Sequence, residues 1–176
     1  MSDVGPLLDK ADIERALRRL GERLDRRGIV ADLYVFGGAA MALAYDARRA
    51  TRDIDALMIP HGVVHEEARA VAAELGLPPW WLNEQASVYT SARSDGAARS
   101  MTFPGLRVAI ASAEHLLAMK VLAARRRDVD DLRILVDELD LADVDQVLTV
   151  VRRVFPDEAV PDRALLALED VFAPDQ

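Results

Sequence analysis

The sequence contains no cysteine and no long apolar run in its 176 residues. The lack of cysteine excludes a disulfide framework, a thiolate zinc site and a cysteine nucleophile. No apolar stretch approaches the ~18 residues needed to cross a bilayer. The first residues, Met1–Pro6, carry neither a basic region nor a long apolar region, so we expect no signal peptide. We therefore expect a cytoplasmic protein without a membrane partner.

Positive charge is scarce overall, because the formal net charge is −8 at pH 7. An acidic protein is a poor non-specific binder of nucleic acid, because attraction to phosphate needs clustered lysine and arginine. The arginines nevertheless cluster within residues 15–27, 48–52 and 125–127. The first cluster is best explained by ion pairs with Glu14, Glu22 and Asp25 along a solvated helix face. The other two clusters provide local basic surface.

Hydrophobic periodicity predicts an α/β region followed by helices. Helices are expected over residues 9–27, 39–45, 61–75, 112–126, 130–139, 143–155 and 161–172. Strands are expected over residues 33–36, 53–59 and 106–111. Ser112 and Asp143 are the expected N-caps of two of the helices. Residues 77–105 are irregular, and we expect loops and short strands there.

Two aspartates stand in an otherwise apolar predicted strand, Asp53-Ile54-Asp55. Strand side chains alternate between faces, so both carboxylates point one way while Ile54 points into the core. Two such carboxylates repel each other unless a cation lies between them, and hard oxygen ligands suit Mg²⁺. The alternative is a solvated strand face with ordinary aspartates, which the low strand propensity of aspartate disfavours. We therefore predict a magnesium site formed by Asp53 and Asp55.

A glycine pair, Gly37-Gly38, stands between a predicted strand and the following helix. Glycine there lets a phosphate approach the backbone, and a helix N-terminus offers free N–H groups. The alternative is a tight turn that merely requires glycine. The pair gains weight because it lies one helix upstream of the two aspartates. Together the two segments predict a phosphate-binding turn beside a metal site.

The run from Phe36-Gly37-Gly38 to Arg49-Ala50-Thr51-Arg52-Asp53-Ile54-Asp55 resembles the DNA polymerase β-type nucleotidyltransferase superfamily. Its ending is most similar to the bacterial subgroup that contains AbiEii-type and MenT-type toxin nucleotidyltransferases. The resemblance spans roughly residues 34–132. It implies an α+β (α/β) fold, with a mixed β-sheet core flanked by helices over residues 1–111. Residues 112–176 are expected to form a C-terminal helical bundle packed on the core as a single compact unit.

Lys120 lies in a predicted helix that is apolar nearly all round. A lysine in such a face needs a partner anion or a route to water, so it either snorkels to the surface or binds an anion. The segment from Arg127 to Leu132 resembles an element of the same toxin families, and Arg127 and Asp131 share the face of Lys120 if the helix continues. The resemblance implies that Lys120 holds the triphosphate. Asp128 is alternatively a helix N-cap.

The chain departs from the superfamily in one respect, because the predicted strand over residues 106–111 has no third carboxylate. Either Asp53 and Asp55 suffice, or Asp131 or Glu84 completes the site. The adjacent Trp80 and Trp81 can stack a base or pack in the core, and core packing is expected for at least one of them. The three histidines show no metal-ligand grouping.

These observations predict a Mg²⁺-dependent nucleotidyltransferase that transfers a nucleoside monophosphate (NMP) from a nucleoside triphosphate (NTP) to an acceptor and releases pyrophosphate. The acceptor is expected to be RNA, a tRNA end, with the protein acting as a toxin whose partner is an antitoxin protein. The alternatives are nucleotidylation of a small molecule or a protein, and a non-catalytic nucleotide-binding or interaction module.

The expected site residues fall into three groups. The catalytic residues are Asp53, Asp55, Lys120 and Asp131, and the first two are also the metal ligands. The residues that bind the nucleotide are Gly37, Gly38, Thr51, Asn83, Lys120 and Arg127. The residues that contact the acceptor are Arg48, Arg49 and Arg52.

Overall fold

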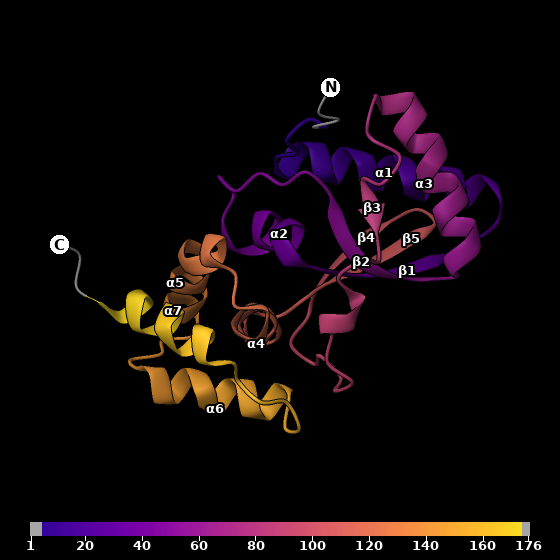
Figure 1. Cartoon of the computed structure of the whole chain (residues 1–176). Helices are drawn as coiled ribbons and strands as arrows, with labels where there is room; N and C mark the ends of the chain where they lie inside the picture. The colour runs from indigo at the N-terminus through magenta and orange to yellow at the C-terminus, as the bar shows by residue number, and fades with distance from the viewer. Residues whose placement is uncertain (1–4, 174–176) are drawn as a thin grey trace. The chain divides into compact units, whose positions relative to one another are not determined.

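The computed structural model describes residues 5–173, and Figure 1 shows the path of the chain. Residues 1–4, which contribute to the expectation of no signal peptide, lie outside the described range, as do residues 174–176. The chain divides into two units. The sheet unit consists of the residues up to Ser87 together with Ala98–Ala111, and the helical unit consists of Val88–Ala97 together with the residues from Ser112 onward. The chain therefore passes between the units after residues 87, 97 and 111.

A mixed sheet of five strands forms the centre of the sheet unit. Its strands are β1 (Ala31–Phe36), β2 (Ile54–Ile59), β3 (Leu82–Asn83), β4 (Arg99–Phe103) and β5 (Leu106–Ile110), in the order β3-β2-β1-β5-β4. β1 pairs antiparallel with β2 and parallel with β5. β2 pairs parallel with β3, and β4 pairs antiparallel with β5. The predicted α+β class with a mixed sheet is confirmed, and β3 and β4 are the short strands expected in the irregular stretch.

Two long helices of the sheet unit, α1 (Lys10–Arg26) and α3 (His61–Leu75), pack against each other (Figure 1). α1 begins at a reciprocal capping pair in which Asp9 accepts from the backbone of Asp12 and Asp12 accepts from that of Asp9. Its apolar stripe, which includes Ile13, Leu17 and Leu20, is completely buried. Burial of this stripe against α3 and β5 explains why the amphipathic pattern becomes a helix here.

The arginines of α1 and of its C-cap residue, Arg27, form ion pairs both within the helix and with α3. Arg23 donates to Glu67 Oε2 at 2.6 Å, and Arg27 donates to Glu67 Oε1 at 2.7 Å. Arg19 contacts Glu22 on α1 but also Glu74 on α3. The predicted pairing within the helix is confirmed for Glu22, whereas the ion pairs with Glu67 and Glu74 of α3 were not predicted. The packing of α1 against α3 brings these carboxylates within reach of the arginines.

A continuous helical stretch follows β1 directly. It consists of α2 (Gly37–Ala40) and a π-helical turn, η1 (Met41–Tyr45), in which the Asp46 amide donates to the Met41 carbonyl at 2.7 Å. The Tyr45 hydroxyl donates to the Ala111 carbonyl at 3.0 Å, and the Arg99 guanidinium donates to the Ala44 carbonyl at 2.7 Å. These contacts attach the end of the stretch to Ala111, which follows β5, and to Arg99, the first residue of β4.

Up to residue 173, the helical unit contains four α-helices, α4 (Ala113–Ala123), α5 (Val129–Glu138), α6 (Val144–Val154) and α7 (Asp162–Phe172), as well as the short turn η3 (Arg126–Asp128). The short turn η2 (Ser87–Tyr89) begins at the last residue of the sheet unit. Ser112 and Asp143 cap α4 and α6 through their side chains, as predicted. α4 packs against α5, α6 and α7, which explains its apolar character nearly all round.

α4 ends three residues earlier than predicted, because Ala124 adopts a left-handed conformation with φ 47°. The helix therefore does not continue from Lys120 to Arg127 and Asp131, so the condition under which these residues would share one helix face is not met. Residues 88–97 join the helical unit through side chains: Ser91 donates to the Val154 carbonyl at 2.6 Å, and Asp95 accepts from the Ser112 amide at 2.8 Å. Among residues 5–173, no helix is long and apolar enough to span a membrane.

Candidate active site

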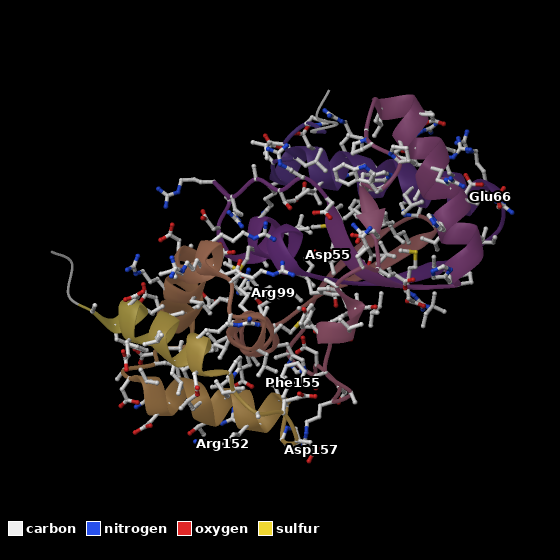
Figure 2. All side chains as sticks on the ribbon, viewed as in Figure 1. Asp55, Glu66, Arg99, Arg152, Phe155 and Asp157 are labelled. Atoms are coloured by element: carbon white, nitrogen blue, oxygen red, sulfur yellow. The ribbon has the colours of Figure 1, made fainter. Side chains whose placement is uncertain are left out.

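Asp53 and Asp55 flank the first residue of β2. The strand begins at Ile54, one residue later than predicted, and Ile54 is completely buried. Asp53 and Asp55 are each half-buried, and Figure 2 labels Asp55 within the sheet unit. Alternating burial is the pattern of a strand with one buried face. It agrees with the predicted placement of both carboxylates on the face opposite Ile54.

The register of the sheet brings three segments together at Asp55. Asp55 pairs with Phe36, the last residue of β1, and with Asn83, the last residue of β3. Gly37 follows Phe36 directly, so the glycine turn begins beside Asp55. The sheet thus places the turn and both aspartates at one end of β1 and β2.

The two glycines pack against the aspartate segment. Gly37 has φ +64°, in the left-handed region that favours glycine. A Cβ atom on Gly37 would lie 3.0 Å from Asp55 Oδ2, and a Cβ atom on Gly38 would lie 3.0 Å from Thr51 Oγ1. The turn therefore requires glycine for its own packing. This requirement is compatible with the approach of a phosphate, so the two explanations of the glycine pair do not exclude each other.

Asn83 and Thr51 hold Asp53 from two sides. The Asn83 amide nitrogen donates to Asp53 Oδ2 at 2.9 Å and to the Trp80 carbonyl at 3.2 Å, while its oxygen accepts from the Gln85 backbone at 3.0 Å. The Thr51 hydroxyl donates to the Asp53 carbonyl at 3.1 Å. These bonds determine the orientation of the Asn83 amide. They also position one carboxylate oxygen of Asp53.

The structure thus gathers six of the predicted site residues in the sheet unit, namely Gly37, Gly38, Thr51, Asp53, Asp55 and Asn83. Among the described residues, no group of three or more histidine and acidic side chains is placed to hold a metal ion. The two aspartates are therefore a partial donor set of hard oxygens. Such a pair fits Mg²⁺, which takes one or two carboxylates and keeps water and phosphate oxygens as its other ligands.

The two candidates for a third carboxylate at the metal site, Glu84 and Asp131, both contact other groups of the protein. Glu84 accepts from the Met58 amide at 3.2 Å and contacts the His61 ring at 2.5 Å. Asp131 lies in the helical unit and accepts from Lys120 at 2.8 Å. Both carboxylates are thus occupied by partners within their own units.

The three arginines that precede the aspartates differ in exposure. The Arg48 side chain is 94% exposed, with its Nε 3.7 Å from Asp46 Oδ1. Arg52 is exposed and donates to the Gly5 carbonyl at 3.0 Å. Arg49 is half-buried. Arg48 is therefore the most accessible cation of this cluster.

In the helical unit, Lys120 forms a buried ion cluster with two aspartates. Its ammonium group donates to Asp131 Oδ2 at 2.8 Å and to Asp128 Oδ1 at 3.1 Å. The three residues are 8%, 2% and 6% exposed, respectively. Of the two alternatives for Lys120, the structure shows partner anions supplied by the protein itself, and the alternative of snorkelling to the surface is wrong. α5, packed on α4, supplies Asp131, although α4 itself ends before Arg127.

Asp128 has a role that the sequence interpretation missed. It stands at the N-cap position of α5, yet its side chain makes no capping hydrogen bond and contacts Lys120 instead. Its spacing of three residues from Asp131 was a usable signal, because such residues are neighbours on a helix face. Arg127 is exposed. The ion cluster thus uses both aspartates of the Arg-Asp-x-x-Asp element and not its arginine.

The two tryptophans have different environments. Trp81 is completely buried and donates from its indole nitrogen to the Ala68 carbonyl at 2.8 Å. The prediction of core packing for at least one tryptophan is therefore confirmed. Trp80 is half-buried and lines a pocket of about 510 Å³ in the sheet unit, together with Asn83. This pocket was not predicted, because its residues come from separate segments of the chain.

A comparison with protein families agrees with a nucleotidyltransferase assignment. Residues 11–162 match the protein family described as "Nucleotidyltransferase of unknown function (DUF6036)". One similar solved structure is described as "Crystal structure of an antigenic nucleotidyltransferase-like protein from Paracoccidioides brasiliensis", with 17% sequence identity, a TM-score of 0.47, and coverage of 95% of this chain and 99% of that chain. No curated protein matches the chain. Because the family match spans most of its length, this chain belongs to the DUF6036 family of nucleotidyltransferases.

Proposed function

We propose that the protein is a Mg²⁺-dependent nucleotidyltransferase that moves an NMP from an NTP to an acceptor. One observation carries the proposal: the Gly37-Gly38 turn packs directly against Thr51 and Asp55. A turn that a phosphate can approach and a pair of carboxylates that can hold a cation are thus in direct contact. An NTP bound there would present its phosphates to both.

Asp53 and Asp55 are the proposed metal ligands. Their oxygens are hard donors on one face of the chain, and Asn83 orients Asp53 through the 2.9 Å hydrogen bond. A Mg²⁺ ion held by them would neutralise phosphate charge and favour departure of pyrophosphate. Both side chains alternate with the buried Ile54 along the chain. The backbone of this segment therefore needs no rearrangement to present the two carboxylates to a metal ion.

The proposed reaction is an in-line displacement at the α-phosphorus of the NTP. An acceptor hydroxyl oxygen forms the new bond to phosphorus, and the bond from phosphorus to the α–β bridging oxygen breaks, which releases pyrophosphate. The proton of the hydroxyl passes to a carboxylate oxygen of Asp53 or Asp55. The backbone of Gly37 and Gly38 is the proposed contact of the phosphates, and Thr51 supports the Asp53 backbone.

The roles proposed for Lys120, Arg127 and Asp131 depend on the sequence resemblance. Lys120 and Arg127 are proposed contacts of the triphosphate, and Asp131 is a proposed catalytic residue. The structure adds that the charge of Lys120 is balanced by two buried carboxylates. A role for Lys120 in NTP binding therefore includes a change in this ion cluster.

The proposed acceptor is an RNA end, with the protein acting as a toxin under the control of an antitoxin protein. The resemblance to toxin nucleotidyltransferases supports this, as does the exposed Arg48 five residues before Asp53. Arg49 and Arg52 are further proposed acceptor contacts. The second candidate is transfer to a small molecule, which the 510 Å³ pocket beside Asn83 favours, because its volume lies in the range of small-ligand sites.

The proposal is tested by incubating the protein with each α-labelled NTP, Mg²⁺ and total RNA. Asp53→Asn and Asp55→Asn should each abolish label transfer without loss of the fold. Asp32→Asn is a matched control, because Asp32 pairs with Ile59 at the opposite end of β2. Label transfer at the wild-type rate by either site variant would refute the metal assignment. Labelling of a protein or metabolite but not of RNA would refute the RNA acceptor.

A further inference from the structure

A pocket of about 510 Å³ opens between the first half of α3 and the segment 79–85. Three cationic or titratable side chains of α3 line it, at His61, His65 and Arg69. They are spaced four residues apart, so they follow one face of the helix. The volume lies within the usual range for pockets that bury a small ligand.

The opposite lining of the pocket is mostly apolar. Trp80 and Pro79 contribute to one side, and Leu82 and Met58 contribute from the strands β3 and β2. Trp81, the adjacent tryptophan, is instead buried in the core. Trp80, by contrast, is half-buried and is the one aromatic residue other than histidine in the lining of the pocket. A flat aromatic ligand is the kind of occupant that such a surface binds by stacking.

The charge of the pocket favours an anion. Among residues 5–173, Arg69 finds no hydrogen-bond or ion-pair partner. The one acidic residue of the lining, Glu84, is engaged by the His61 ring and the Met58 amide. Arg69 therefore remains available for a phosphate or carboxylate group. The pocket thus combines an aromatic surface with an available cation.

Asn83 connects this pocket to the candidate active site. It lines the pocket, and its amide nitrogen donates to Asp53 Oδ2 at 2.9 Å. A ligand in the pocket would therefore lie one side chain away from a proposed metal ligand.

We propose that the pocket binds a nucleotide, with the base stacked on Trp80 and a phosphate on Arg69, and that this nucleotide is the acceptor. The binding follows from the pocket itself, whereas the role as acceptor rests on the proposed function. A free nucleotide and the terminal nucleotide of an RNA share this chemistry.

Calorimetric titration tests the binding independently of turnover. The four ribonucleoside monophosphates are titrated in EDTA, which removes Mg²⁺ and with it metal-dependent NTP binding. At least one should bind the wild type, and Trp80→Leu should weaken it about tenfold or more, because stacking on an aromatic side chain has this magnitude. Trp80→Phe should restore most of the affinity. No binding of any of the four, or equal binding by Trp80→Leu, would overturn the proposal.

Arg69 is tested with the matching nucleoside as a second ligand. Arg69→Gln should weaken the monophosphate about tenfold and leave nucleoside binding unchanged, because only the phosphate contact is lost. Arg26→Gln, at an exposed arginine of α1, is the control and should bind as the wild type does. Unchanged binding of the monophosphate by Arg69→Gln would overturn the phosphate contact.

Two further comparisons separate the pocket from the proposed function. In the first, a trinucleotide RNA is titrated beside the monophosphate. Tighter binding of the RNA that still depends on Trp80 identifies an RNA end as the occupant, whereas equal affinities of the two ligands identify a free nucleotide. Trp80-dependent binding without any label transfer would support the pocket and refute the transferase. Label transfer at the wild-type rate by both Trp80→Leu and Arg69→Gln would support the transferase and refute the pocket as its acceptor site.

Discussion

Replacement of Gly37 by alanine tests the contact between the glycine turn and the metal segment. Gly37 has φ +64°, and a Cβ atom there would lie 3.0 Å from Asp55 Oδ2. Gly28 provides a matched control, because it has φ +69° and a Cβ atom there meets no atom within 4 Å. The two alanine variants share the same backbone strain, but only Gly37→Ala disturbs Asp55.

The magnitudes follow from these two geometries. Alanine in the left-handed region costs about 1–2 kcal/mol, so both variants should lose a similar part of the free energy of unfolding. The reduced entropy of the unfolded chain offsets part of this cost equally in both. In Gly37→Ala, Asp55 must also move by a few tenths of an ångström to reach an ordinary contact of 3.4–4 Å. Because a misplacement of about 1 Å can cost about 100-fold in rate, we expect label transfer to fall about tenfold to 100-fold.

Urea denaturation measures the loss of stability, and transfer from an α-labelled NTP measures the loss of function. Titration with Mn²⁺, followed by paramagnetic relaxation of water, measures cation affinity without turnover. Gly28→Ala should lose the part of the stability that comes from backbone strain, while keeping wild-type transfer and Mn²⁺ affinity. Equal transfer and equal Mn²⁺ affinity in the two variants would refute the coupling between the turn and Asp55.

Three further predictions follow from the ion pairs and the basic cluster. Lys120→Met leaves two buried carboxylates without a counter-ion, so the free energy of unfolding should fall by about 3–5 kcal/mol in urea denaturation; a loss below about 1 kcal/mol would contradict the buried ion cluster. The double variant Arg48→Ala/Arg49→Ala should lower transfer to RNA and flatten its dependence on salt, with NTP affinity unchanged; wild-type labelling of RNA would argue against acceptor contacts there. Burial raises the pKa of the Glu67 carboxyl, but hydrogen bonds from its two arginines lower it by more, so that pKa lies below its ordinary 4.5. Glu67→Gln should therefore lower the free energy of unfolding by about 1–2 kcal/mol near pH 7. The difference from the wild type should shrink as the pH falls below 4.5, because the stabilisation is lost as Glu67 protonates. A difference that is constant with pH would contradict the ion pairing.

The sequence was sufficient to predict the local elements of the site. Asp53, Ile54 and Asp55 followed from strand alternation, and the glycine pair followed from its place between a strand and a helix. These features depend on neighbours a few residues apart, so their periodicity and turn chemistry are visible in one segment. The caps of α4 and α6 at Ser112 and Asp143 were predictable for the same reason.

Contacts between distant segments were not predictable in this way. The bond from Asn83 to Asp53 joins residues 30 positions apart, and its existence depends on the pairing of β3 with β2. The end of α4 at Ala124 was also missed, because alanine has the highest helix propensity and gives no stop signal. Lys120 still meets Asp131, but through the packing of α5 on α4 and not along one helix.

The decapeptide 88–97 has a consequence for the order in which the chain can fold. Its hydrogen-bond partners in the helical unit, Ser112 and Val154, are synthesised after it, whereas β4 and β5 of the sheet unit follow it directly. Domains tend to fold as units during synthesis, N-terminal unit first. The sheet unit can therefore close as soon as residue 111 is available, with the decapeptide held as a loop between its strands. That loop would keep its polar groups in water until α6 emerges, so a chain shortened after residue 111 should be most sensitive to proteases within residues 88–97.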